Sequence, residues 1–279
     1  MATAVFVPLS AFLRSPSFRW AVGGWSFFIA ENVILSENRG YLIQMLGDEG
    51  YHAAYGTLST AAMVSVAYAY RYKLGASPYS SGVPLFHKGM AFVSVSLGLI
   101  LVSQTLPKFQ LPVTMVSPPP SITNNPTVAV PNNRSFRVQC PFDFTDKKLS
   151  HGAVHGIERI TRHPGLWSMG FVGLGQSFMM LGNPAKKAFW CMPLLVAWIG
   201  GSHTDSRHRR GMGGTLRPEE DAMSSNVPFI ALLRNAGASG SMSWDEFKVL
   251  NAFIAVAMSG LWVWRTGRVP KPMIMAMAK

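Results

Sequence analysis

Charged residues are scarce in this sequence, and acidic residues are the scarcest of them. Asp, Glu, Lys and Arg make up 14% of the 279 residues, whereas soluble domains contain roughly 25%. Only 13 residues are acidic and 25 are basic, so the formal net charge is +12, and 48% of the residues are apolar. This composition argues against an ordinary soluble domain and indicates a polytopic membrane protein.

Cysteine is nearly absent as well. Cys140 and Cys191 lie far apart in the chain, and no Cys-x-x-Cys pair occurs. A structural zinc site uses four ligands, commonly from closely spaced Cys pairs, and two thiols cannot build a disulfide framework. We therefore expect neither a zinc centre of this kind nor a fold held by disulfides.

The excess of basic residues does not indicate nucleic-acid binding. Lys and Arg occur in ones and twos at the ends of apolar stretches, with no basic stripe interleaved with aromatic residues. Basic residues that flank apolar stretches are typical of segments that meet anionic lipid headgroups. The predicted partner is therefore the lipid bilayer, and no nucleic acid.

Six stretches of about 16 to 22 residues carry little or no charge, the length that a helix needs to cross a hydrocarbon core of about 30 Å. Glu31 interrupts the first of them. The sequence therefore predicts an all-α fold, a polytopic membrane helix bundle with about six transmembrane helices. The predicted crossings are residues 20–35, 51–70, 89–107, 164–185, 188–204 and 249–264.

The remaining segments differ in composition. The loop between the third and fourth helices is rich in Pro and Asn and is predicted to be irregular, whereas residues 226–233 are apolar but too short to cross. The N-terminal segment fits either a basic flank or an organellar presequence. The predicted divisions are a basic flank (1–19), three membrane helices (20–107), the Pro/Asn-rich loop (108–150), a helix hairpin (151–204), a polar Gly-rich loop (205–248), and the last helix with a basic tail (249–279).

The charge distribution supports six crossings. With six, the segments 1–19, 71–88, 186–187 and 265–279 fall on one side and hold 11 of the 25 Lys and Arg residues but none of the 13 acids. Basic residues in short flanks favour the cytoplasm-like side of a membrane. We therefore expect both termini on a cytosol-, matrix- or stroma-like side.

Several polar residues are predicted to meet where this membrane region ends. His163 opens the fourth stretch and His203 closes the fifth, so a tight turn at Lys186 and Lys187 returns both to one face, and Glu31 falls there too. Asp205 follows His203. Ionisable residues at such positions suggest a functional site; the alternative is that Arg162, Asp205 and Arg207 only cap helix ends, pair with one another and meet headgroups.

His151 and His155 form a second, weaker candidate. Their spacing of four places both on one face of a helix, where they could hold a metal ion. The same spacing also occurs in any polar amphipathic stretch, so both interpretations stay open.

The stretch ITRHPGLWSMGFVGLGQ, with GSHTDSRHRR about thirty residues later, resembles the NnrU-like integral membrane family, which includes plant zeta-carotene isomerase. The earlier stretch SENRGYLIQMLGDEGYHAAYGTLSTAAMVSVAYAY resembles the first conserved region of that family. The resemblance covers roughly residues 20–75 and 150–215. It implies a multi-pass fold, haem b bound through His side chains, and isomerisation of a cis double bond in a carotenoid without net redox change.

This resemblance also implies which residues bind haem, and here the sequence departs from the family. His163 matches the His of the Arg-His-Pro motif, and His203 and Asp205 match the His-x-Asp region. The two positions nominated as haem ligands are Asn32 and Gln176. Carboxamides are poor haem ligands, so these residues are predicted to form interhelical hydrogen bonds instead. Met179 and Met180, which lie close to Gln176, are possible replacement ligands.

Two functions are compatible with these observations. The first is a structural or accessory subunit of a membrane complex in an organelle, without haem, in the mitochondrial inner membrane or a plastid, with its termini on the matrix or stroma side. The alternative is a haem-dependent isomerase or oxidoreductase of a carotenoid or another lipid-soluble substrate, in which His163, His203, Asp205 and Glu31 carry the chemistry. No inverted repeat that would indicate a transporter is visible.

Overall fold

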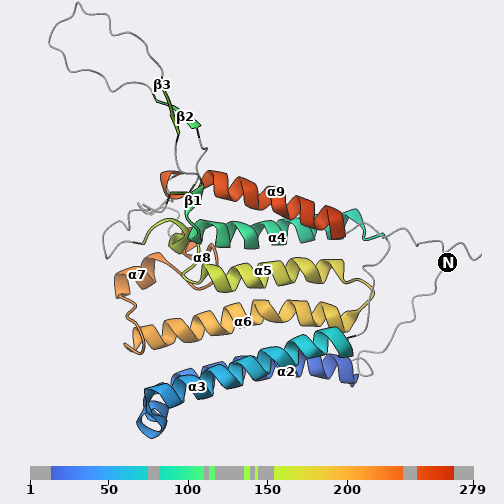
Figure 1. Cartoon of the computed structure of the whole chain (residues 1–279), viewed down its shortest axis with the longest axis vertical. Coiled ribbons are helices and arrows are strands. Elements are labelled where there is room, and N and C mark those ends of the chain that lie inside the picture. Colours follow the sequence, from blue (N-terminus) through green and yellow to red (C-terminus); the bar gives the residue numbers. More distant parts are fainter. Residues whose placement is uncertain are drawn as a thin grey trace, which may run out of the picture.

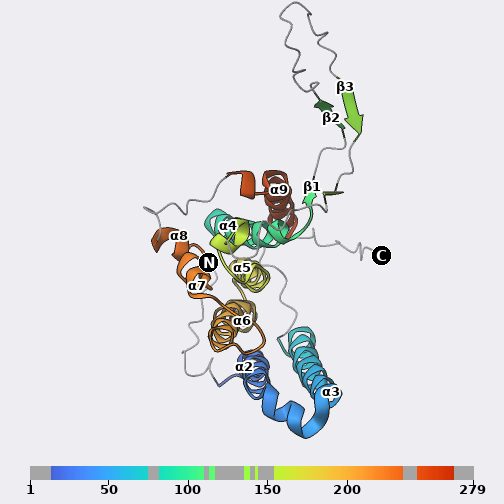
Figure 2. The ribbon, with the colours of Figure 1, turned by 90° about the vertical axis from the view of Figure 1, so that its left-hand side faces the viewer.

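The long helices of the described chain lie side by side in one curved row (Figures 1 and 2). The computed structural model describes residues 14–74, 82–109, 113–116, 135–138, 142–143, 154–234 and 244–266. Contacts between helices give the order α9, α4, α5, α6, α2 and α3 along the row. The long helices are α2 (Pro16–Glu37), α3 (Arg39–Tyr68), α4 (Leu85–Thr105), α5 (Pro164–Met179), α6 (Pro184–Arg209) and α9 (Val249–Thr266).

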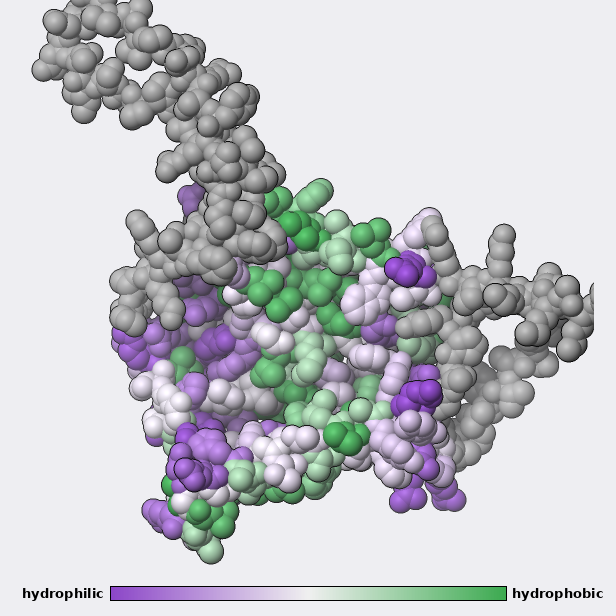
Figure 3. Space-filling model, viewed as in Figure 1, coloured by the Kyte–Doolittle hydropathy of each residue, from purple (hydrophilic) through white to green (hydrophobic). Residues whose placement is uncertain are grey.

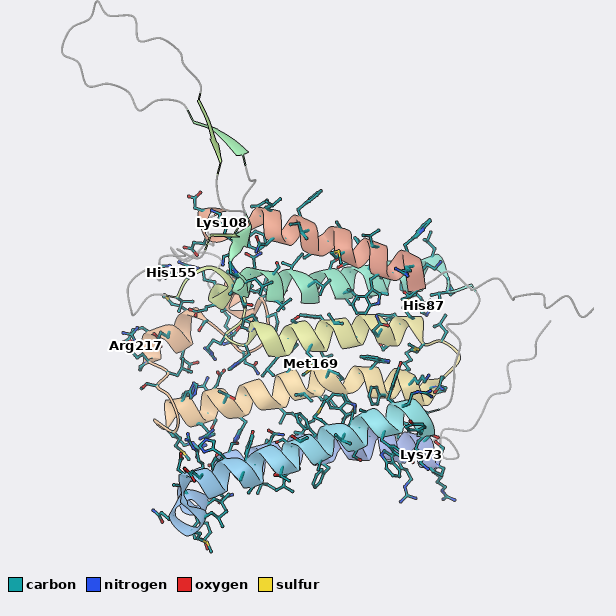
Figure 4. All side chains as sticks on the ribbon, viewed as in Figure 1. Lys73, His87, Lys108, His155, Met169 and Arg217 are labelled. Atoms are coloured by element: carbon teal, nitrogen blue, oxygen red, sulfur yellow. The ribbon has the colours of Figure 1, made fainter. Side chains whose placement is uncertain are left out.

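Short elements cap the helices of the row at both of their ends. The starts of α5 and α9 and the ends of α2 and α6 share one end, which we call the motif end because it holds Arg162 and His163. The opposite end, with Lys73 and His87 (Figure 4), we call the basic end. The short elements are a π-turn (Ala69–Lys73) at the basic end and, at the motif end, α7 (Pro218–Met223), α8 (Ile230–Arg234) and the 3-10 turns Gly156–Arg159 and Trp244–Glu246.

Proline and a polar cap set the starts of two helices. Ser15 accepts a hydrogen bond from the Phe18 amide and precedes Pro16, the first residue of α2. Asn183 accepts from the Lys186 amide and precedes Pro184, the first residue of α6. Proline suits the first helical turn, where its missing N–H is not needed.

All six predicted helices are present, but some boundaries are wrong. The second was expected at residues 51–70, whereas α3 begins at Arg39, because the helix also includes a preceding stretch that contains Arg39, Asp48 and Glu49 and is bent at Gly47 (φ 74°). The fourth was expected to reach residue 185, whereas α5 ends at Met179. The turn between α5 and α6 therefore lies at residues 180–183, and Lys186 belongs to the first turn of α6.

Glycine lets α5 pack closely on two opposite sides. A Cβ on Gly173 would lie 2.6 Å from the Trp190 carbonyl oxygen of α6. A Cβ on Gly175 would lie 2.5 Å from a Val95 methyl of α4. Small residues that allow such approach are typical of helix contacts in membranes, and these two explain why α5 lies in the middle of the row.

The loop between α4 and α5 is not irregular throughout, in contrast to the prediction. Within its described residues, β1 (Lys108–Phe109) pairs antiparallel with β4 (Phe142–Asp143). Strand β2 (Val113–Val116) pairs antiparallel with β3 (Ser135–Val138). Antiparallel pairing satisfies the backbone groups of a segment that lacks helical periodicity. Cys140 and His151 lie outside the described residues.

The row exposes apolar side chains between two polar ends (Figure 3). By length and composition, two described helices, α4 and α9, could cross a membrane, and only 33% and 28% of their apolar windows are buried. A core helix of a soluble protein would be mostly buried. The other four predicted crossings do not meet that measure among the described residues, so six crossings stay a proposal.

Candidate functional site

Arg162, His163 and Asp205 form the centre of the motif end. Asp205, on the last turns of α6, is only 2% exposed. The Nη2 and Nε atoms of Arg162 donate to its Oδ2 at 2.5 and 3.1 Å. Nε2 of His163 lies 2.8 Å from Oδ1. Both residues before α5 are therefore held on one buried carboxylate of α6.

These partners also set the charge state of Asp205. Burial alone would raise the pKa of its carboxyl group, but hydrogen bonds from His163 and Arg162 outweigh burial, so the pKa is lowered. The carboxylate is thus ionised at neutral pH and neutralises the Arg162 guanidinium. A charge-assisted contact of this kind is short and strong.

The segment after α6 folds back over Arg162. Its Nη1 donates to the carbonyl and hydroxyl oxygens of Ser224, each at 3.0 Å, and its backbone N–H donates to Ser225. Nη1 also lies 3.1 Å from Asp221. Asp221 accepts two hydrogen bonds of 2.7 Å from Arg209, which lower its pKa. The loop from 210 to 229 is therefore anchored on the start of α5.

Asn226 completes this contact, and no sequence pattern had indicated it. Its Oδ1 accepts from the Trp167 indole at 3.0 Å, and its backbone oxygen accepts from the Thr161 hydroxyl at 2.5 Å. Its Nδ2 donates to the Trp198 carbonyl and to the Ser202 hydroxyl. Asn226, 7% exposed, thus ties α5 to α6. The apolar character of residues 226–233 reflects this docking onto the helix ends.

His203 belongs to a different contact. Its Nε2 lies 2.8 Å from the Ser36 hydroxyl of α2, and its Nδ1 lies 4.0 Å from Glu37. Arg210 donates to both carboxylate oxygens of Glu37 at 2.6 and 2.9 Å, which lowers the pKa of Glu37. The His-x-Asp motif therefore joins α6 to two neighbours, α2 through His203 and α5 through Asp205.

Glu31 and Asn32 form a polar cluster with α3. Oε1 of Glu31 accepts from Ser59 at 2.9 Å and from Asn32 at 2.6 Å. Asn32 in turn accepts a short hydrogen bond from the Tyr55 hydroxyl, so the predicted interhelical bond of Asn32 is present. Glu31 is 7% exposed, and its Oε2 has no hydrogen-bond partner among the described residues.

Gln176 does not form the interhelical bond that was predicted. It is 3% exposed on α5, and no hydrogen bond joins its side chain to another described residue. It lies thirteen residues from His163, or about 20 Å along the helix at about 1.5 Å per residue. Met179 is 1% exposed and packs against Val83 and Ala91, while Met180 is also buried.

This arrangement does not fit a haem at the positions that the family nominates. Asn32 lies on α2 and Gln176 on α5, and α6 lies between these helices. Haem iron takes His, Met, Cys or Tyr as axial ligands, and both positions hold carboxamides. His163 and His203 are engaged with Asp205 and Ser36.

In the second candidate site, His155 lies near a carboxylate, but neither of its ring nitrogens forms a hydrogen bond with a described residue. Nδ1 of His155 lies 3.7 Å from Glu246, which also accepts from Arg159. His155 lies at the motif end in Figure 4. Its predicted partner, His151, is outside the described residues. Among those described, no group of three or more His, Cys, Asp or Glu side chains could hold a metal ion.

A comparison with protein-family models places the chain in a family. Residues 21–265 match the family model described as NnrU protein. The chain belongs to the NnrU protein family. The match covers the whole row of helices, far more than the two stretches that carry the resemblance in the sequence. Together with α4 and α9, it identifies the chain as a membrane protein of this family. Searches of curated proteins and of solved structures returned no match.

Proposed function

We propose that this NnrU family member is a structural or accessory subunit of an organellar membrane complex, without the haem that the resemblance implies. All six long helices cross the bilayer, with the basic end and both termini on the matrix or stroma side. The supporting observation is that the motif residues already bind other parts of the fold. Arg162 and His163 bind Asp205, and Arg162 also binds the loop after α6. Groups engaged in this way hold the fold.

The shape of the row supports a role in assembly. Each helix packs only on its neighbours in the row. The outermost helices, α3 and α9, each pack mainly on one long helix. Large apolar side chains stay exposed on both, with Phe253 70% exposed, Leu261 65% and Val64 61%. In a bilayer these surfaces meet lipid or the helices of other subunits.

The first test is an absorbance spectrum of the protein purified in mild detergent, oxidised and then reduced with dithionite, with a pyridine haemochrome assay. We expect much less than one haem per chain. A stoichiometric b-type spectrum would overturn the haem-free proposal, and Ala variants of His163, His203, Met179 and Met180 would then identify the ligands.

The second test concerns the complex. We expect the chain to migrate in blue native gels of the source membranes as part of a complex much larger than the 30.5 kDa of one chain. Removal of the chain should destabilise the same complex. Migration as a single chain in the mildest detergent, with no other complex affected by its removal, would contradict a subunit role.

One observation favours the alternative, a membrane isomerase or oxidoreductase. Among the described residues, no donor reaches one buried carboxylate oxygen of Glu31, and no acceptor reaches the buried Nε atom of Arg207. Unpaired ionisable groups inside a membrane region are frequent in functional sites. Turnover of a carotenoid by the purified chain that is abolished by Glu31→Gln would favour this alternative over the subunit role.

A further inference from the structure

The motif end and the basic end differ in how their charges are compensated. Every ion pair among the described residues lies at the motif end. The basic end carries no acidic residue, and none of its described basic side chains forms an ion pair with a described residue. They are Arg14, Arg19, Arg71, Lys73, Lys88, Lys186, Lys187 and Arg265. This end therefore presents uncompensated positive charge.

The π-turn at the end of α3 arranges part of this charge against exposed aromatic rings. The Lys73 ammonium lies 5.8 Å from the ring centre of Trp20 and 5.9 Å from that of Tyr68. The Arg71 guanidinium lies 5.3 Å from the ring centre of Tyr72. The three rings are 41%, 45% and 65% exposed. We call these five residues the aromatic–basic platform.

The platform is fixed to the rest of the basic end. The Ser17 hydroxyl donates to the Lys73 carbonyl oxygen at 2.7 Å. Asn183 donates to the Leu74 carbonyl oxygen at 2.7 Å, which joins the π-turn to the start of α6. These bonds fix the backbone from which Arg71, Tyr72 and Lys73 project, and a preorganised backbone lowers the ordering cost of binding a ligand.

Lys186 adds a buried charge beside the platform. It is 7% exposed, and its ammonium lies 5.1 Å from the ring centre of Tyr70, within the same π-turn. No described carboxylate pairs with it. A cation in a partly desolvated position is screened less by salt than an exposed one, so it strengthens the positive potential at the π-turn.

We propose that the aromatic–basic platform binds the phosphate of an anionic phospholipid headgroup. Lys73 and Arg71 contact the phosphate oxygens, while Trp20, Tyr68 and Tyr72 lie at the level of the headgroup and glycerol. A lipid is favoured over free phosphate because amphipathic rings gather where headgroups meet acyl chains. The inference rests on the proposed function, which places this end at a membrane surface.

The experiment uses the full chain in nanodiscs of phosphatidylcholine with increasing phosphatidylglycerol, and counts the retained lipids by native mass spectrometry. We expect the unchanged chain to retain phosphatidylglycerol preferentially. The double variant Arg71→Gln/Lys73→Gln should lose roughly 5-fold in this preference for each charge removed, or roughly 25-fold together.

Two matched controls each remove one exposed basic charge outside the platform. Lys187→Gln lies at the same end and Arg234→Gln at the motif end, and neither residue contacts an aromatic ring or an acid among the described residues. Both should keep at least half of the preference. An equal loss per charge in Lys187→Gln would show a diffuse attraction and overturn the site.

Further arms test the lipid itself. Tyr72→Ala keeps both charges and should still weaken retention severalfold, whereas an unchanged preference would contradict the role of the rings. Displacement of the lipid by millimolar inorganic phosphate would mean that the site binds free phosphate instead. A chain that enters nanodiscs without any preference overturns only this inference, whereas a chain that does not enter bilayers overturns the proposed membrane function.

Discussion

Asp205→Asn provides the sharpest test of the motif end. The substitution keeps the shape of the side chain but removes the charge that neutralises Arg162, and the two side chains are only 3% and 13% exposed. Breaking a buried ion pair by removing one partner costs about 3–5 kcal/mol. Asp221 still lies 3.1 Å from Arg162, so we expect the lower limit, about 3 kcal/mol.

The expected change in thermal stability follows from this energy. A loss of 1 kcal/mol lowers Tm by about 2–4 °C in chains of comparable size, so Asp205→Asn should lower it by about 6–12 °C. Tryptophan fluorescence in detergent reports the transition, because Trp167 is buried against Asn226. The matched control is Asp245→Asn, which changes an exposed carboxylate.

A decrease of less than about 2 °C, equal to that of the control, would refute the reasoning, since it corresponds to less than about 1 kcal/mol. The energy of the pair can be separated from the cost of an orphaned charge by a double-mutant cycle. The variant Arg162→Met/Asp205→Leu, with neither charge, should be more stable than Asp205→Asn, because buried pairs are often replaced by apolar residues without loss.

Three further predictions concern other residues. Since the native pKa of Asp205 is lowered, its contribution to stability is complete above the ordinary carboxyl pKa of about 4 and is lost as the pH falls through the lower native value; Tm should fall less steeply there in Asp205→Asn, and parallel curves would contradict this. Gly175→Ala, which pushes a methyl against α4, should cost about 1–3 kcal/mol in a thermal melt, whereas Gly165→Ala faces open space and should be nearly neutral. Glu31→Gln removes a buried charge with one unpaired oxygen and should leave Tm equal or higher; a decrease above about 5 °C, more than about 1 kcal/mol, would show that a cation compensates Glu31.

The sequence predicts the presence of the helices better than their arrangement. Stretches with little or no charge that are long enough to cross a bilayer identify all six, because charged side chains are costly, and therefore rare, in a helix surrounded by lipid or protein. The first three turns of α3 escape that criterion because Arg39, Asp48 and Glu49 interrupt their apolar residues. The single-row order depends on which faces approach closely. Glycines mark these close approaches, Gly98 and Gly175 between α4 and α5, and Gly170 and Gly173 between α5 and α6, but the sequence does not show which of its many glycines do so.

The sequence singled out Arg162, His163, His203 and Asp205 but did not predict which of them contact one another. The alternative in which Arg162 and Asp205 pair with each other is the one that the geometry contains. His163 contacts Asp205, and His203 and Asp205 are two residues apart on α6, so their side chains point about 200° from each other. His203 and His163 therefore do not meet. Asn226 could not be predicted, since its contacts with Trp167 and Thr161 join residues far apart in the chain and follow no periodic pattern.

This geometry explains how the motif can be kept while the nominated ligand positions differ. Arg162 and Asp205 are each the principal counter-charge of the other in a buried place, so changing one alone is costly. Asn32 accepts a hydrogen bond from Tyr55, and Gln176 is neutral, so a carboxamide at either position needs no charged partner. The Arg-His-Pro and His-x-Asp motifs are therefore evidence for the NnrU fold, in which α6 is joined to α5 and α2. These contacts account for the motif residues without any reaction, so the motifs alone do not establish an activity.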